Sequence, residues 1–168
     1  MTWNIPNNNY QELINWATSN KTRIRKHLNL LKRMRKGAVD KLIHALHEEA
    51  FDHINCLECG NCCGSLGPRI TEKDIQVLTK SLGKNEEKIK RQYLKIDEDN
   101  DLIFNSLPCP FLNTNVTCSV YHDHPRACKT YPHTDQPNQV SLLTLMLKNS
   151  SICPAVAYIT KSLVEKES

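Results

Sequence analysis

The chain has 168 residues, which suits one domain, or one domain with a small helical extension. Lys and Arg number 22 against 18 Asp and Glu, so the formal net charge is only +4 at pH 7. Hydrophobic residues make up 39% of the chain and aromatic residues 6%, which excludes a fold with a large aromatic core. A bound metal would help a chain with so little core material to hold together.

Two membrane-related classes are not expected. No window approaches the run of about 18 apolar residues that a membrane-spanning helix requires. Residues 1–6 have neither the basic region nor the apolar region of a secretory signal. We therefore expect a cytoplasmic protein without a membrane span.

Residues 7–54 are predicted to be helical, because their apolar residues recur at the 3.6-residue spacing of an amphipathic helix. Gly37 is expected to interrupt the pattern. The apolar positions are Tyr10, Leu13, Ile14, Ala17, Ile24, Leu28, Leu31, Met34, Leu42, Ile43, Leu46, Ala50 and Ile54. We take residues 1–54 as a basic, amphipathic N-terminal segment and residues 55–168 as a cysteine-rich domain.

Two helices and a strand are predicted next. Thr71 is placed to cap a helix that ends at Gly83, and Asn85 to cap a second helix that runs through Leu94. Residues 97–101 form a polar loop before a short strand at residues 102–104. Residues 107–137 are rich in Pro, Cys and Asn and predict short hairpins and turns.

The C-terminal region contains one ambiguous segment and one clear helix. Residues 142–147 fit either a strand or a helix. Pro154 suits the first turn of a final helix. The predicted fold is therefore mainly α with short β hairpins, a small single cysteine-rich domain preceded by a helical segment.

The cysteines carry the strongest signal in the chain. Four of them fall within eight residues, and four more are scattered over the later half. They are Cys56, Cys59, Cys62, Cys63, Cys109, Cys118, Cys128 and Cys153. Thiols at this density form a disulfide framework, a zinc site or an iron–sulfur cluster. A reducing cytoplasm disfavours stable disulfides, so we expect all eight to be candidate metal ligands.

The spacing of the dense run suits a metal, because two intervening residues let both sulfurs of a C-x-x-C turn point at one ion. Cys56, Cys59 and Cys62 repeat the first part of the bacterial ferredoxin run, whose distant last cysteine is followed by Pro. Both Cys109-Pro110 and Cys153-Pro154 fit that last position. Because neighbouring side chains diverge, one of Cys62 and Cys63 is expected to join Cys56 and Cys59 and the other to face elsewhere. Eight thiolates suffice for two centres, although a buried cysteine is also a common core residue.

Three strings in order resemble a known family. They are Cys56-x-x-Cys59-Gly60-x-Cys62-Cys63, Cys109-Pro110-Phe111-Leu112, and Cys118-Ser119-Val120-Tyr121 followed by Pro125-x-x-Cys128-x-x-Tyr131-Pro132. They resemble the YkgJ-type cysteine-cluster proteins, also described as a zinc- or iron-chelating CxxCxxCC domain. The resemblance covers roughly residues 54–135 and implies that the cysteines chelate metal. A similar pattern in a flagellin lysine methylase implies an iron–sulfur cluster.

The chain departs from the family pattern at two positions. His124 and Lys129 stand where the family has Arg. An Arg fork makes hydrogen bonds in a fixed geometry that His and Lys cannot reproduce, so no role is transferred to these positions.

Histidines are weaker metal candidates than the thiols. His44 and His47 lie three residues apart on a predicted helix, where a histidine is usually a surface residue. His122, His124 and His133 are closer to the cysteines in sequence and are the better candidates of the seven.

A basic stretch without acids lies between Glu12 and Asp40. Its cations, with the one that follows Asp40, are Lys21, Arg23, Arg25, Lys26, Lys32, Arg33, Arg35, Lys36 and Lys41. They suit nucleic acid, an anionic membrane surface or an acidic partner. A solvated helix face explains them equally simply, and we favour it because no aromatic residues interleave with the charges.

Three functions remain open. The first is a metal-chelating protein with zinc or iron, the iron including the case of a 4Fe–4S centre. The second is a redox or electron-transfer iron–sulfur protein, and the third is a metal-stabilised module that docks on nucleic acid or a protein partner. No glycine-rich phosphate loop, dinucleotide fingerprint, zinc-protease helix or serine-hydrolase motif is present, so an independent enzyme is not expected.

Overall fold

The computed structural model describes residues 8–166, and the expectation for residues 1–6 lies outside them. In chain order, the described elements are α1 Asn8–Ser19, α2 Lys21–Leu31, α3 Lys36–His53, the 3₁₀ helix η1 Cys56–Glu58, α4 Asn61–Ser65, α5 Glu72–Leu82, α6 Glu86–Tyr93, β1 Leu94–Ile96, β2 Leu102–Phe104, the 3₁₀ helix η2 Tyr121–Asp123, α7 Arg126–Thr130, α8 Gln139–Asn149 and α9 Pro154–Glu165. The predicted class, mainly α with a short β hairpin, is confirmed.

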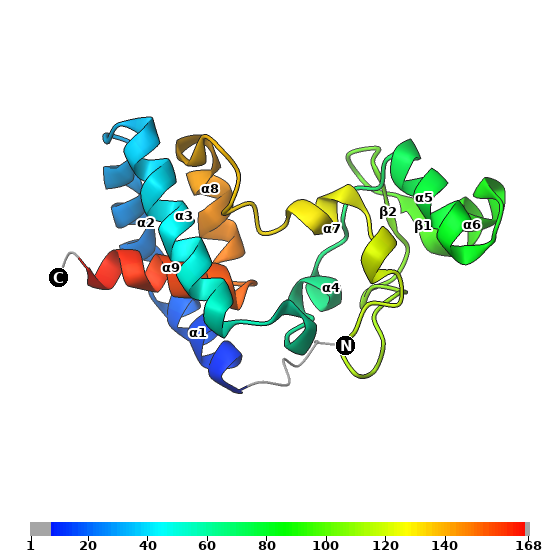
Figure 1. Ribbon diagram of the computed structural model, residues 1–168, viewed down its shortest axis with the longest axis horizontal. Helices are drawn as coiled ribbons and strands as arrows, with labels where there is room; N and C mark the ends of the chain where they lie inside the picture. Colours follow the sequence, from blue (N-terminus) through cyan, green and yellow to red (C-terminus); the bar gives the residue numbers. More distant parts are fainter. Residues whose placement is uncertain (1–7, 167–168) are drawn as a thin grey trace. The chain divides into compact units, whose positions relative to one another are not determined.

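Contacts divide the described chain into two compact units (Figure 1). Residues 8–59 and 132–166 form the first, which we call the helical unit. Residues 60–131 form the second, the hairpin unit. The last two helices of the chain therefore pack with the first three. The predicted division between residues 54 and 55 stays a prediction.

The helical unit is a bundle in which α9 packs against α1, α2, α3 and α8. In Figure 1, α9 is drawn in red and runs across the first three helices. Ile159 and Val156 of α9 are fully buried, as are Ile43 and Val39 of α3. Burying such side chains supplies the main favourable term for holding helices together.

One acidic side chain fixes the start of α8. Asn138 precedes this helix with a left-handed backbone (φ 62°), and its own side chain makes no capping bond. Asp40 of α3 provides the cap instead, because its carboxylate accepts the N–H groups of Asn138 at 2.9 Å and Gln139 at 2.7 Å. These bonds hold the pKa of Asp40 below its usual value, with a smaller contribution from His44. The segment of unclear type at residues 142–147 is thus helical.

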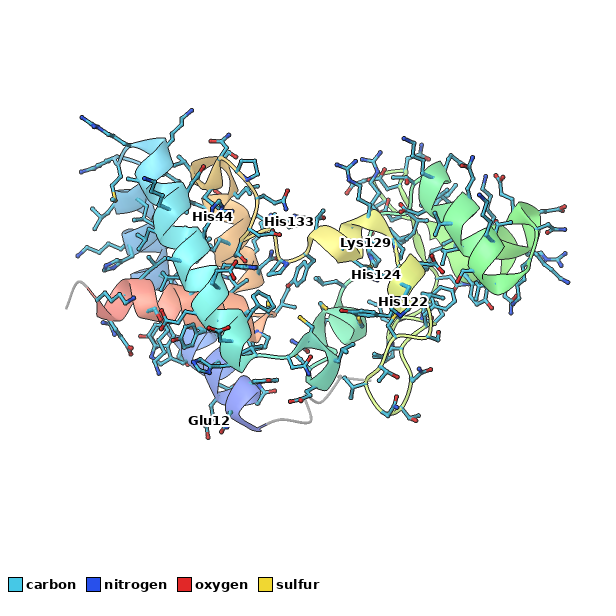
Figure 2. The ribbon with its side chains drawn as sticks, viewed as in Figure 1. Glu12, His44, His122, His124, Lys129 and His133 are labelled. Atoms are coloured by element: carbon cyan, nitrogen blue, oxygen red, sulfur yellow. The ribbon has the colours of Figure 1, made fainter. Side chains whose placement is uncertain are left out.

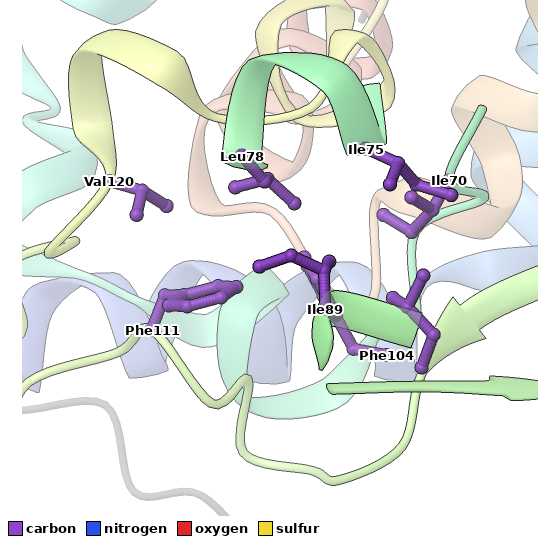
Figure 3. Packing of buried hydrophobic residues seen from close by; sticks show 8 residues of the cluster. Ile70, Ile75, Leu78, Ile89, Phe104, Phe111 and Val120 are labelled. Atoms are coloured by element: carbon purple, nitrogen blue, oxygen red, sulfur yellow. The ribbon is translucent and has the colours of Figure 1, made fainter. Parts of the chain in front are cut away.

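The hairpin unit has a small core of its own, shown in Figure 3. Its buried members are Ile70, Ile75, Leu78, Ile89, Leu94, Phe104, Phe111 and Val120. Phe111 packs edge-on to Phe104, with ring centroids 5.3 Å apart, and tilted against Tyr93 at 4.9 Å. Because α5, α6, both strands and the loop after them all contribute, this core fixes the cysteine-bearing loops of the unit.

The helix boundaries in the hairpin unit follow the predicted caps. Thr71 and Asp74 form a reciprocal capping box at the start of α5, and Gly83 ends that helix with a left-handed backbone. Asn85 caps α6 through the N–H of Lys88. The prediction that this helix runs through Leu94 is wrong, because Leu94 begins β1 and pairs with Phe104 in an antiparallel hairpin.

The N-terminal helices also differ from the prediction in one detail. The break lies at residues 32–35, and Gly37 falls inside the first turn of α3 rather than interrupting a helix. Met34 lies in this break and is 44% exposed, so it does not continue the apolar stripe. Glycine costs little in a first turn, where the backbone is only partly hydrogen-bonded.

No single helix among the described residues is long and apolar enough to cross a membrane. The pair α8 and α9 passes such a test only when taken together, and it is bent by 112° at the break between the two helices.

Candidate metal centre

Four cysteines of the hairpin unit come from separate segments and act on one another electrostatically. Cys63 lies on α4, Cys109 lies after β2, and Cys128 lies on α7. Cys118 pairs with Leu112 in an isolated antiparallel β-bridge. The backbone N–H of Cys109 donates to the carbonyl of Cys63 at 2.8 Å, which joins the dense run to the later half of the chain. We call these four residues the thiol cluster.

Electrostatic coupling connects all four members of the cluster. Burial raises the pKa of Cys109 to about 11, and the charges of Cys63 and Cys118 contribute to that rise. Burial raises the pKa of Cys128 to about 12, with contributions from Cys63, Cys109 and Cys118. The pKa of Cys118 is also raised, by burial and by Cys63. Each thiolate therefore destabilises the next, so a cation among them would relieve both the repulsion and the cost of burial.

Cys63 differs from the other three. Its Sγ lies 4.0 Å from the Sγ of Cys62, and that neighbouring thiol lowers the pKa of Cys63 to about 7. At neutral pH Cys63 is therefore the member that gives up its proton first. Since the thiolate is the form that binds metals, the lowered pKa of Cys63 favours metal binding at this residue near neutral pH.

Backbone N–H groups point at two of the sulfurs. The Cys109 thiol accepts hydrogen bonds from the N–H groups of Phe111 and Leu112, which act against the rise in its pKa. The Cys118 thiol likewise accepts from the N–H of Val120. A hydrogen bond to the ionised form favours that form, so these turns suit thiolates. Phe111 and Val120 are themselves core residues, which fixes each turn against the core.

Asp74 positions the helix that carries Cys128. Its Oδ1 accepts the N–H of Arg126, the first residue of α7, at 2.8 Å, while Oδ2 accepts the N–H and hydroxyl of Thr71 at 2.8 and 2.6 Å. Burial acts to raise the pKa of Asp74, but these bonds and the charge of Lys129 outweigh it and keep the pKa below 3.8. The charge of Lys129 thus acts on Asp74, an effect that the resemblance to the family did not predict.

A second group of cysteines lies in the helical unit. Cys56 begins η1 and is exposed, whereas Cys59 ends the same turn and is buried. Cys153 is buried at the residue before α9. Burial raises the pKa of Cys153 to about 12, and the charges of Cys56 and Cys59 add to the rise. These three thiols therefore come together although Cys153 is distant in sequence. Whether Cys62 or Cys63 joins Cys56 and Cys59 stays a prediction.

The histidines have other contacts. His44 Nε2 lies 2.9 Å from the carbonyl of Gln136, and His47 Nδ1 lies 2.8 Å from the hydroxyl of Thr134, so both side chains hold the segment before α8. His122 and His124 lie against the ring of Tyr121, at 5.8 and 5.2 Å between centroids, and Figure 2 shows both beside α7. His124 Nδ1 also makes a short contact with the carbonyl of Tyr121.

None of the eight cysteines, all of which lie within residues 8–166, forms a disulfide. Among residues 8–166, however, no group of three or more His, Cys, Asp or Glu side chains is already arranged around one ion position. The thiols share an electrostatic environment without enclosing an ion, so binding must include movement of the sulfurs toward a common centre. Such coupling between metal and structure is usual for thiolate sites.

The donor set restricts the chemistry. Thiolates are soft ligands that select zinc, iron–sulfur clusters and copper(I) over magnesium or calcium. Cys109 and Cys118 pack against an apolar core and their sulfurs accept backbone N–H groups, both of which suit a thiolate-bound metal. The residues present therefore fit zinc or iron.

Fold and site together describe a small, mainly helical protein with clustered thiols. The chain belongs to the CxxCxxCC family, whose model is described as a "putative zinc- or iron-chelating domain" and matches residues 55–154, more than half of the chain. The predicted resemblance is thereby confirmed, and so is metal chelation in its general form. No curated protein and no solved structure matches the chain.

Proposed function

We propose that this protein binds zinc or iron through cysteine thiolates, and that Cys63, Cys109, Cys118 and Cys128 form its principal centre. The observation that carries the proposal is their mutual electrostatic effect inside one unit, with burial and repulsion raising three of the four pKa values. Cys62 supplies a further thiol, 4.0 Å from Cys63. The backbone N–H groups that reach Cys109 and Cys118 do not outweigh burial and repulsion, and a bound cation would do so.

Each residue has a distinct part in the proposal. Cys63 would hold the metal as the thiolate that forms nearest to neutral pH. Cys109 and Cys118 would be further ligands, since N–H groups support their thiolate forms. Asp74 holds α7 so that Cys128 can complete the set. When bound, the metal supplies positive charge that replaces four thiol protons, and those protons leave to solvent.

Zinc and iron give different functions from the same residues. Zinc would make the centre structural, because it has no redox chemistry. A 4Fe–4S cluster would make the protein an electron carrier or an oxidant sensor, and its potential would depend on the N–H groups that reach the sulfurs. We propose the cytoplasm as the location for either, since reduced thiols persist there.

Metal analysis of cysteine variants tests the principal centre. The protein is purified without oxygen and its zinc, iron and acid-labile sulfide are measured per chain. Cys109→Ser and Cys128→Ser should each lose the metal of this centre and unfold at lower temperature. Thr130→Ala, on the same helix as Cys128, should retain wild-type metal. Wild-type metal content in both cysteine variants would show that these thiols are not ligands.

A second candidate function rests on the basic surface, which we define as Lys21, Arg23, Arg25, Lys26, Lys32, Arg33, Arg35, Lys36 and Lys41. All nine side chains are exposed on α2, α3 and the break between them. In the described part of the chain, none of them is in an ion pair. Such a surface attracts phosphates, so we propose duplex nucleic acid as its partner, with the metal centre acting only on the fold.

A further inference from the structure

Two large apolar side chains lie exposed within the basic surface. Leu30, in the last turn of α2, is 41% exposed, and Met34, in the break that follows, is 44% exposed. Met34 lies at the centre of the run Lys32-Arg33-Met34-Arg35-Lys36, with two exposed cations on each side. A single exposed apolar residue is common on protein surfaces. These two, however, lie within a surface that already attracts an anionic partner, so they add an apolar contact to its charge.

The backbone that carries Met34 is fixed at both ends. The N–H groups of Arg33 and Met34 donate to the carbonyls of Leu30 and Leu31, both at 3.0 Å, so the chain continues to turn after α2 ends. Leu31 before the break is 2% exposed and Val39 after it is fully buried, which anchors both helices in the bundle. Met34 is therefore presented on a short, tight turn in a defined position.

The start of α3 leaves room beside this turn. Gly37 and Ala38 are exposed and have almost no side chain, and a methyl group added to Gly37 would meet no other described part of the chain within 4 Å. The side chain of Arg35 makes no capping bond at this helix start. A phosphate can therefore approach the first turn of α3 as well as the cations. The surface next to Met34 thus allows close contact with a nucleic-acid backbone.

The apolar content of α2 favours a duplex over a lipid surface. A helix that lies on a membrane buries a wide apolar face in it. In α2 that face is made of Ile24, Leu28 and Leu31, and all three are buried within the helical unit. Only Leu30 and Met34 remain outside, which is little to insert into lipid. One or two such side chains are enough to form a wedge between base pairs, and Leu and Met are among the residues that serve this purpose.

We propose that Met34, with Leu30 one helical turn before it, enters a base step of duplex DNA from the minor groove and bends the duplex. The proposal rests on the nucleic-acid function proposed for the basic surface and adds the mode of binding. The minor groove is about 6 Å wide, which is too narrow for a helix but admits the side chains of a turn. The cations on both sides of Met34 contact the phosphates that flank the step. Pyrimidine–purine steps unstack most easily, so the protein prefers deformable sequences.

Fluorescence energy transfer between dyes at the two ends of a short DNA duplex measures the bend. The full-length protein is added to one duplex with a central TA step and to another with a stiff A-tract. We expect energy transfer to rise when the wild type binds, and the TA duplex to be bound about tenfold more tightly than the A-tract. The double variant Leu30→Ala and Met34→Ala should bind both duplexes equally and without the rise. Its salt dependence should match that of the wild type, because every cation remains.

Two further variants serve as controls. Val77→Ala removes a side chain of similar exposure (39%) from α5 of the hairpin unit and should bend DNA as the wild type does. Met34→Leu keeps an apolar side chain in the turn and should also bend the duplex.

The outcomes separate the wedge from the function on which it rests. If the wild type binds DNA without a rise in energy transfer, or if the double variant bends DNA as much as the wild type, the wedge is wrong and the nucleic-acid function stands. If the wild type binds neither duplex, or binds anionic vesicles alone, both proposals are overturned.

Discussion

A single carboxylate connects two elements on which the proposed centre depends. Asp74 belongs to the first turn of α5, yet one of its oxygens accepts the N–H that starts α7. The sequence predicted that Thr71 caps this helix, and the capping box that Asp74 forms with Thr71 confirms it. The contact with Arg126 had no sequence signal, because no local pattern relates residues in separate segments.

Asp74→Asn tests this connection. The substitution keeps the shape but removes the charge that strengthens three hydrogen bonds, so we expect about 2 kcal/mol of destabilisation at pH 7. The pKa of Asp74 is lowered in the folded state, so its contribution is complete above the ordinary value of 3.8 and disappears as the pH falls below it.

Urea unfolding at pH 7 and at pH 3 measures this difference. The difference in the free energy of unfolding between wild type and variant should be smaller at pH 3 than at pH 7. Glu98→Gln, at an exposed acid in a turn, serves as the control and should leave the free energy of unfolding unchanged at both pH values. If Asp74→Asn destabilises the protein as much at pH 3 as at pH 7, the assigned role of the carboxylate is contradicted.

At the scale of elements, helix α8 depends on a side chain of α3. Asp40 accepts the two N–H groups at the start of α8, where the residues of α8 itself provide no cap. His44 and His47 add contacts to the same segment. In the sequence, these residues lie on a predicted helix with scattered histidines and show no relation to residues 134–139. Their shared contacts with that segment are visible only in the packed structure.

Asp40→Asn should lower the melting temperature of the helical unit. The hydrogen bonds from Gln139 and Asn138 lower the pKa of Asp40. The decrease in melting temperature caused by the substitution should therefore be largest near neutral pH and vanish as the pH falls well below 3.8. Thermal unfolding followed by circular dichroism measures the shift. Glu48→Gln, on the same helix, is the matched control, and a shift of equal size in that variant would mean that the effect is not specific to the cap.

The elements that sequence predicted correctly are those whose signals are local. The caps at Thr71 and Asn85, the stop at Gly83 and the proline start of α9 are all properties of a few neighbouring residues. Leu94 was misplaced because a three-residue strand has no visible period, and its pairing with Phe104 decides its conformation. Residues 142–147 stayed ambiguous for the same reason, since only packing against α3 distinguishes a buried helix from a buried strand.

At the scale of the whole molecule, the cysteine pattern predicted the family and the type of chemistry but not the grouping of the thiols. Spacing suggests that Cys56, Cys59 and Cys62 act together, whereas packing associates Cys63 with three later cysteines. Phe111 and Val120 in the core fix the positions of Cys109 and Cys118, and Asp74 fixes the helix of Cys128, none of which a spacing rule describes.

The basic surface leads to a prediction for the intact protein. If its cations contact the phosphates of duplex DNA, the logarithm of the association constant should fall linearly with the logarithm of the salt concentration. The triple variant Lys32→Glu, Arg33→Glu and Lys36→Glu should reduce the magnitude of that slope by about 3. Fluorescence anisotropy over a salt series measures it, with Lys80→Glu, Lys88→Glu and Lys95→Glu as a control of equal charge. An unchanged slope, or binding to anionic vesicles alone, would contradict the nucleic-acid proposal.

X-ray absorption at the zinc and iron edges of the anaerobically purified protein tests the central claim most directly. Thiolate ligation predicts a first shell made of sulfur, at about 2.3 Å for zinc, with iron neighbours beyond it if a cluster is present. Cys128→Ser should lower the bound metal without replacing sulfur by nitrogen in what remains. A first shell of nitrogen or oxygen near 2.0 Å in the wild-type protein would contradict the account.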